Sequence, residues 1–243
     1  MISKKYTLVI SIVAILLLSL VSVFFFGKPI KTYWDIWSNI RKCKSQLKLH
    51  PDSSGIYRQW GLDLYLLGDY QDAIPKLKKS NELNPNWAGN YGCLAICYDK
   101  LNMHDESLVA WQKAADLDPK NSNRWNDLGR ALAKVNRPKE AILQYQKALR
   151  LNRTDYMAYE LWGDALIELG KYPEAIKKYQ FLLVLNDKNP FALSQTAFSL
   201  EKLGRHNEAV AEYKRAIQAN TFSPTLKAED EMAIVNIEKE LKN

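Results

Sequence analysis

The feature that most constrains the fold of this 243-residue chain is a sequence pattern that returns every 34 residues. Five units follow one another without a gap over residues 54–223. In every unit the eighth position holds a small residue and the twenty-fourth a large one. A fixed period of this length predicts a stack of similar supersecondary units, each of which buries its apolar face against the next. The units are residues 54–87, 88–121, 122–155, 156–189 and 190–223.

The columns of the repeat predict two helices joined by a turn in each unit. A small residue on one helix lets a large residue of an antiparallel neighbour approach closely. The fifteenth position is always Gly or Asn, the residues that tolerate the left-handed conformation at a helix end. The predicted helix stops are Gly68, Asn102, Asn136, Gly170 and Gly204.

This pattern resembles the tetratricopeptide repeat family. The family's sequence of aromatic, Leu, Gly, Tyr, Ala, aromatic, Ala and Pro is almost intact in RWNDLGRALAKVNRPKEAILQYQKALRLN, residues 124–152. The closing proline of the family pattern is present as Pro85 and Pro119, and it is replaced in the later units. The resemblance implies an all-α protein, a right-handed α-solenoid of helix-turn-helix units whose first helices line a concave groove.

Segments on both sides of the five units continue the helical pattern. Residues 27–53 contain a stretch, Tyr33 to Leu49, with apolar residues at helical spacing, and Pro51 keeps the phase of the repeat. We interpret this segment as a juxtamembrane helix and degenerate half repeat. Residues 224–243 are amphipathic and are predicted to form a capping helix, because the last unit of a solenoid otherwise exposes an apolar face.

The N-terminal region predicts a membrane anchor. After a short tail, residues 1–6, the stretch from Thr7 to Phe26 contains 20 residues without a charge. As a helix it would be about 30 Å long, which is the thickness of the hydrocarbon layer. A cleaved signal peptide is the alternative, but bulky residues lie where a cleavage site needs small ones. We therefore predict a single-pass protein with a transmembrane helix over residues 7–26.

The distribution of charge argues against nucleic-acid binding. The chain has a formal net charge of +7, and residues 1–53 contain eight Lys and Arg against two Asp, so the repeats are nearly neutral. Cations that flank an apolar segment indicate membrane topology and attraction to lipid headgroups. More Lys and Arg follow the predicted anchor than precede it, which favours a cytoplasmic repeat domain.

The sequence contains no pattern that predicts an enzyme, a cofactor site or a metal site. Three cysteines cannot form a paired disulfide framework, and Cys93 and Cys97 have no second Cys or His pair at ligand spacing. Small buried thiols in a helix interface are the simpler interpretation. His104 and His206 both occupy the hairpin turn of their units, and no phosphate-binding glycine loop or activated nucleophile is present.

The resemblance places binding residues on the first helix of each unit, at positions 2, 5, 9, 12 and 13. One subclass of the family grips the C-terminal carboxylate of chaperone tails, but Leu62, Cys93 and Asp127 stand where that clamp needs polar or cationic side chains. A protein partner of another kind is expected. The candidate partner-binding residues are Arg58, Leu62, Tyr65, Ile96, Asn126, Arg130, Glu160, Asp164, Glu168, Phe191 and Phe198.

Three of these candidates form an acidic strip. Glu160, Asp164 and Glu168 are spaced by four residues, so like charges share one helix face and repel one another. Arg130 and Lys134 on the preceding first helix could neutralise the strip internally. Alternatively, the strip receives a basic segment of a partner, flanked by apolar contacts to Phe191 and Phe198.

The sequence thus favours a membrane-anchored scaffold for protein–protein interaction that binds a peptide or helix of its partner, for example as an assembly factor for a membrane complex. The alternative is a structural or regulatory component that forms a homo-oligomer through its repeats. Light scattering over a range of concentrations on the fragment from residue 29 onward separates the two.

Overall fold

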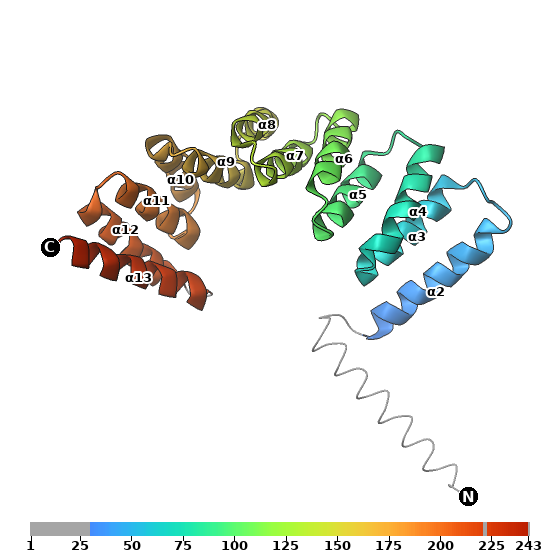
Figure 1. Ribbon diagram of the computed structural model, residues 1–243, viewed down its shortest axis with the longest axis horizontal. Coiled ribbons are helices and arrows are strands. Elements are labelled where there is room, and N and C mark those ends of the chain that lie inside the picture. The colour runs from blue at the N-terminus through green and yellow to red at the C-terminus, as the bar shows by residue number, and fades with distance from the viewer. Residues whose placement is uncertain (1–29, 221–222, 243) are drawn as a thin grey trace, which may run out of the picture. The chain divides into compact units, whose positions relative to one another are not determined.

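The computed structural model describes residues 30–220 and 223–242, and within these residues the chain is entirely α-helical (Figure 1). The chain divides into two compact units, residues up to Ala110 and residues from Trp111, and the division falls inside helix α6. The helices are α2 (Ile30–Leu47), α3 (Ser54–Leu67), α4 (Tyr70–Leu83), α5 (Ala88–Lys100), α6 (His104–Leu117), α7 (Ser122–Lys134), α8 (Pro138–Leu151), α9 (Tyr156–Glu168), α10 (Tyr172–Leu185), α11 (Pro190–Lys202), α12 (His206–Ala219) and α13 (Pro224–Glu240).

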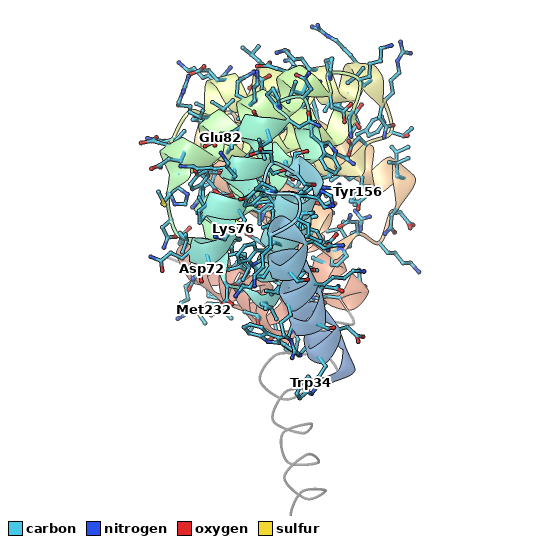
Figure 2. The ribbon with its side chains drawn as sticks, turned by 90° about the vertical axis from the view of Figure 1, so that its right-hand side faces the viewer. Trp34, Asp72, Lys76, Glu82, Tyr156 and Met232 are labelled. Carbon is cyan, nitrogen blue, oxygen red and sulfur yellow. The ribbon has the colours of Figure 1, made fainter. Side chains whose placement is uncertain are left out.

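In the first unit, α2 packs against the hairpin of α3 and α4. One face of α2 buries Ile36, Ile40 and Cys43, a spacing that places all three side chains on one side of a helix. The opposite face exposes Trp34, 65% accessible, and Trp37; Figure 2 labels Trp34 near the N-terminal end of α2. The sequence therefore gives α2 one face for the solenoid and one aromatic face for contacts outside it.

The second unit contains three complete hairpins, α7–α8, α9–α10 and α11–α12, followed by α13. The small and large columns meet as the sequence predicts. A Cβ atom built on Gly129 would lie 2.3 Å from Tyr145, and one on Gly163 would lie 2.5 Å from Tyr179. Both tyrosines are fully buried, so each hairpin is closed by an aromatic ring lying directly on a glycine.

The hairpin turns confirm the predicted helix stops. Gly68, Asn102, Asn136, Gly170 and Gly204 all have positive φ, between 58° and 86°. In the third repeat the amide of Asn136 donates to the carbonyl of Ala133, and the amide of Arg137 donates to the carbonyl of Leu132. These bonds satisfy carbonyls that are left open at the end of α7. The chain then reverses into the second helix of the hairpin.

Helix α13 covers the end of the last hairpin, where it lies beside α12 (Figure 1). Its Ile237 is 2% exposed and packs in one cluster with Tyr213, Ala209 and Leu200. Its N-terminus is capped by Ser223, whose hydroxyl accepts a hydrogen bond from the amide of Leu226.

None of the helices within residues 30–220 and 223–242 has the length and hydropathy needed to cross a membrane. The predicted anchor, residues 7–26, and the tail before it lie outside the described residues, so the anchor stays a prediction. The right-handed superhelix implied by the family resemblance also stays a prediction.

Candidate functional site

The first unit contains four of the predicted binding residues, and all four are partly exposed. Leu62 and Ile96 occupy the ninth position of successive units, on α3 and α5. The guanidinium of Arg58 lies 3.2 Å from the centre of the Trp87 ring, and burial lowers the pKa of this arginine. Tyr65 packs against Tyr70, with ring centres 6.0 Å apart. This surface is aromatic and apolar, with one cation already engaged by an indole ring.

In the second compact unit, the ninth position of each repeat is again partly exposed. The residues at this position are Arg130, Asp164 and Phe198. Asn126 behaves differently, although we predicted it as a groove residue. It is 1% exposed, and its amide donates to the Asp155 carboxylate at 2.8 Å. The other oxygen of Asp155 caps α9 by accepting from the amide of Ala158. In this structure the side chain of Asn126 joins α7 to the capping residue of α9 and leaves almost no surface for a partner.

The acidic strip of α9 is held in a poorly solvated environment. Glu160 and Asp164 are half-buried and Glu168 is exposed at the end of the helix. Burial is the main cause that raises the pKa of all three carboxyl groups, and repulsion from Asp164 raises the pKa of Glu160 and Glu168 further. The charged form of the strip is therefore disfavoured, and a cation placed beside it would relieve that cost.

A buried tyrosine and a partly buried phenylalanine lie beside the middle of the strip. The hydroxyl of Tyr179, on α10, donates to the Asp164 carboxylate at 2.6 Å, and this bond partly offsets the rise in the pKa of Asp164. The Tyr179 ring meets Phe191, on α11, edge to face with centres 6.3 Å apart. Asp164 and Phe191 are thus connected through one tyrosine, and a carboxylate and an exposed aromatic edge belong to one surface.

Arg130 lies near the strip but is also engaged on its own helix. Its guanidinium is 3.9 Å from the Asp127 carboxylate. The buried hydroxyl of Tyr145 is affected by three of these charges: Arg130 lowers its pKa, and Asp164 and Glu168 raise it. Internal compensation of the strip by this arginine is therefore partial, because the carboxyl pKa values remain raised by burial.

A groove of about 750 Å³ lies between α11 and α13, with its floor completed by α9 and α12. Its lining includes the apolar residues Phe198, Leu226 and Met232 and the acidic residues Glu201 and Asp230. Ser194 donates its hydroxyl to Asp230 at 2.6 Å, and Tyr213 donates to Glu201 at 3.1 Å.

Phe198 is one of the partner-binding residues predicted from the sequence, whereas Ser194 and Asp230 were not predicted. A signal for Asp230 was available: it lies four residues after Leu226 and seven before Ile237, so a carboxylate interrupts the apolar stripe of α13. Ser194 occupies the fifth position of its unit, where a short hydroxyl gives no signal on its own.

The groups on this surface suit the binding of a ligand. Within the residues that the structure describes, no group of three His, Cys, Asp or Glu side chains could hold a metal ion. Cys43 and Cys97 are buried, Cys93 is partly buried, and none of the three forms a disulfide. Poorly solvated carboxylates beside exposed aromatic rings suit a cationic, partly apolar ligand.

Comparison with known proteins supports the fold. The tetratricopeptide repeat family model matches residues 126–192 and 160–224. No curated protein matches the chain at a significant level. Among solved structures, the tetratricopeptide protein YrrB aligns with a TM-score of 0.67 and 20% identity over 81% of this chain and 97% of its own.

Two further structures share the fold. MamA aligns with a TM-score of 0.64 and 24% identity, over 68% of this chain and 91% of its own. PilW, a type IV pilus biogenesis factor, aligns with a TM-score of 0.61 and 19% identity, over 78% and 92% of the two chains. The sequence of residues 126–224 therefore matches the tetratricopeptide repeat family, and the described residues share the helical-hairpin fold of these solved structures.

Proposed function

We propose that this chain is a scaffold that binds a basic segment of a partner protein along α9 and α11, close to a membrane. The observation that carries the proposal is the acidic strip of Glu160, Asp164 and Glu168. Burial raises the pKa of all three carboxyl groups, and repulsion from Asp164 raises the pKa of the other two further. A partner lysine or arginine would replace this unfavourable arrangement by charge-assisted hydrogen bonds. Phe191 and Phe198 on the neighbouring helix would contact the apolar part of the same segment.

The known proteins with this fold agree with such a role. YrrB is described as having an unusual peptide-binding site, and PilW as a biogenesis factor for type IV pili. With an anchor at residues 7–26, the repeats of this chain would be tethered at the membrane by a short connection. We therefore propose the more specific role of an assembly factor for a membrane complex.

A peptide array tests the proposal directly. Peptides that mix leucine, alanine and lysine would be compared with versions in which lysine is replaced by glutamate or by norleucine. We expect the full chain to retain lysine peptides selectively, and this retention to weaken as salt concentration rises, because the contact is partly solvent-exposed. Equal retention of the three peptide sets would overturn the proposal.

Two matched double variants test whether the selected peptide binds at α9. E160Q/D164N removes two charges from the strip and should weaken binding of the selected peptide about tenfold or more. E140Q/E174Q removes the same charge from exposed sites on the second helices of two hairpins and should leave binding unchanged. If both double variants reduce the affinity equally, only the net charge of the chain matters and the strip is not the site.

Self-association is the second candidate, and one observation favours it. Val184 is 82% exposed and Leu185 is 53% exposed at the end of α10, an apolar pair that a second copy could cover. Light scattering of the full chain over a range of concentrations would then show a mass above that of one chain, and V184E would reduce it.

A further inference from the structure

The carboxylate of Asp230 is buried in a way that its neighbours do not explain. The residue is 1% exposed, although it belongs to the last helix of the chain. Its Oδ1 accepts the hydrogen bond from Ser194, but its Oδ2 has no hydrogen-bond partner. A buried carboxylate oxygen without a partner is costly, so its presence in a folded protein calls for an explanation.

Asp155, which also lies in the second compact unit, is a buried aspartate whose two carboxylate oxygens both have hydrogen-bond partners. It also bonds a residue at the fifth position of a repeat, because Asn126 donates to its Oδ2 at 2.8 Å. Its other oxygen, Oδ1, accepts from the amide of Ala158. Both oxygens of Asp155 therefore serve the fold, whereas in Asp230 only one does.

Asp230 is one of the residues that line the groove between α11 and α13. Glu201 also lines this groove. Burial raises the pKa of the Tyr213 hydroxyl, and the charges of Glu201 and Asp230 raise it further. Glu201 already has a cation, since its carboxylate is 3.3 Å from the ammonium of Lys202. Asp230 has none among its hydrogen-bond and ion-pair contacts in the described residues.

The walls of the groove suit the stem of a long cationic side chain. Leu226 and Met232 on α13 and Phe198 on α11 offer apolar surface on either side of the carboxylates. Lysine and arginine bury their methylene stems along such surface while the charged end meets a carboxylate. Phe198 already interacts with a cation, because the ammonium of Lys202 lies 5.0 Å from its ring centre.

We infer that the groove between α11 and α13 binds one lysine or arginine side chain of the partner segment, with Asp230 as its counter-ion and Ser194 as the residue that orients Asp230. The inference rests on the proposed function and names a second contact, separate from the strip on α9. The cation donates to Oδ2, while the Ser194 hydroxyl holds Oδ1 in place. The site therefore fixes the register of a basic segment that also runs along α9.

A double-mutant cycle tests this inference with a lysine peptide selected on the array. Each lysine of the peptide in turn is replaced by norleucine, which keeps the stem and removes the charge. Fluorescence anisotropy with the full chain, in nanodiscs of uncharged lipid, gives the affinity of each peptide for the wild type and for D230N. We expect one lysine whose replacement weakens binding to the wild type about tenfold and leaves binding to D230N unchanged.

The variants are chosen so that folding and charge are controlled. D230N keeps an oxygen that can accept from Ser194, and E238Q removes the same charge from an exposed site on α13 and should bind every peptide as the wild type does. E201Q is a second variant on the groove, which should weaken binding of the same lysine peptide even if D230N folds poorly. The inference is overturned if no lysine couples to Asp230 and E201Q binds normally.

The experiments distinguish failure of the proposed function from failure of the present inference. If E160Q/D164N binds as the wild type does while one lysine couples to Asp230, the groove is a site and the strip is not. If E160Q/D164N loses binding, no lysine couples to Asp230 and E201Q binds normally, the strip is the site and the present inference is wrong.

Discussion

Gly129 shows how one residue decides whether a hairpin can close. The ring of Tyr145 lies where a Cβ atom of residue 129 would be, and it is itself 1% exposed and enclosed on all sides. The ring therefore cannot move away without disturbing its other contacts. In the last hairpin the same repeat position holds Ala197, which packs in one cluster with Tyr213. That hairpin therefore has room for a methyl group at this position, whereas the hairpin of Gly129 and Tyr145 does not.

We predict that G129A lowers the free energy of unfolding by about 1–3 kcal/mol, the usual cost of overpacking a tight core. The matched control is G55A in the first turn of α3, where an added Cβ meets nothing within 4 Å. That variant should be neutral or slightly stabilising, because alanine favours the helix over glycine. Urea unfolding followed by circular dichroism measures both, and equal midpoints for the two variants would contradict the prediction.

At the scale of the element, the helices and their turns could be predicted because the information is local. Helical spacing sets the buried faces, and Gly or Asn at a fixed position ends each first helix. The role of a polar side chain could not be predicted in the same way. Asn126 and Glu160 occupy the same repeat position, yet the first bonds Asp155 inside the array and the second belongs to the acidic strip. That difference depends on what the next repeat offers, which periodicity does not reveal.

Helix α9 is predicted to affect how stability depends on pH. Burial raises the pKa of Glu160 and Asp164, so the folded chain holds these protons more tightly than the unfolded chain, whose carboxyl groups titrate near about pH 4. Their contribution to stability is therefore fully present below about pH 4 and is lost as pH rises through the raised pKa values.

D164N should remove part of this dependence. Asparagine still accepts from the Tyr179 hydroxyl, so we expect higher stability than the wild type at pH 7 and a flatter profile down to about pH 4. E208Q is a control for which the change in the pH dependence of stability should have the opposite sign, because the hydrogen bond from Arg205 lowers the pKa of Glu208. Urea midpoints over this pH range decide the question, and a wild-type slope in D164N would show that Asp164 does not contribute to it.

For the whole molecule, the uneven distribution of charge separates two tasks. Six of the seven net positive charges lie in residues 1–53, and the repeats that bear the acidic strip are close to neutral. The exposed aromatic face of α2 belongs to the basic part, with Trp34 and Trp37 near its start. Tryptophan beside lysine suits the boundary between lipid and water. Attachment to a membrane and recognition of a partner would then reside in different parts of the chain.

We predict that residues 7–26 hold the chain in the membrane as an uncleaved anchor. The full chain should remain in the membrane pellet after alkaline carbonate extraction, and a chain lacking residues 1–28 should be released. L17R is the matched single change, because a charge near the centre of a spanning helix costs about 2.5–3.5 kcal/mol on insertion. Sequencing the N-terminus of the membrane-bound protein separates an anchor from a signal peptide. A mature chain that begins near Lys28 would refute the anchor and the membrane-proximal role, yet peptide binding at α9 would still stand on its own test.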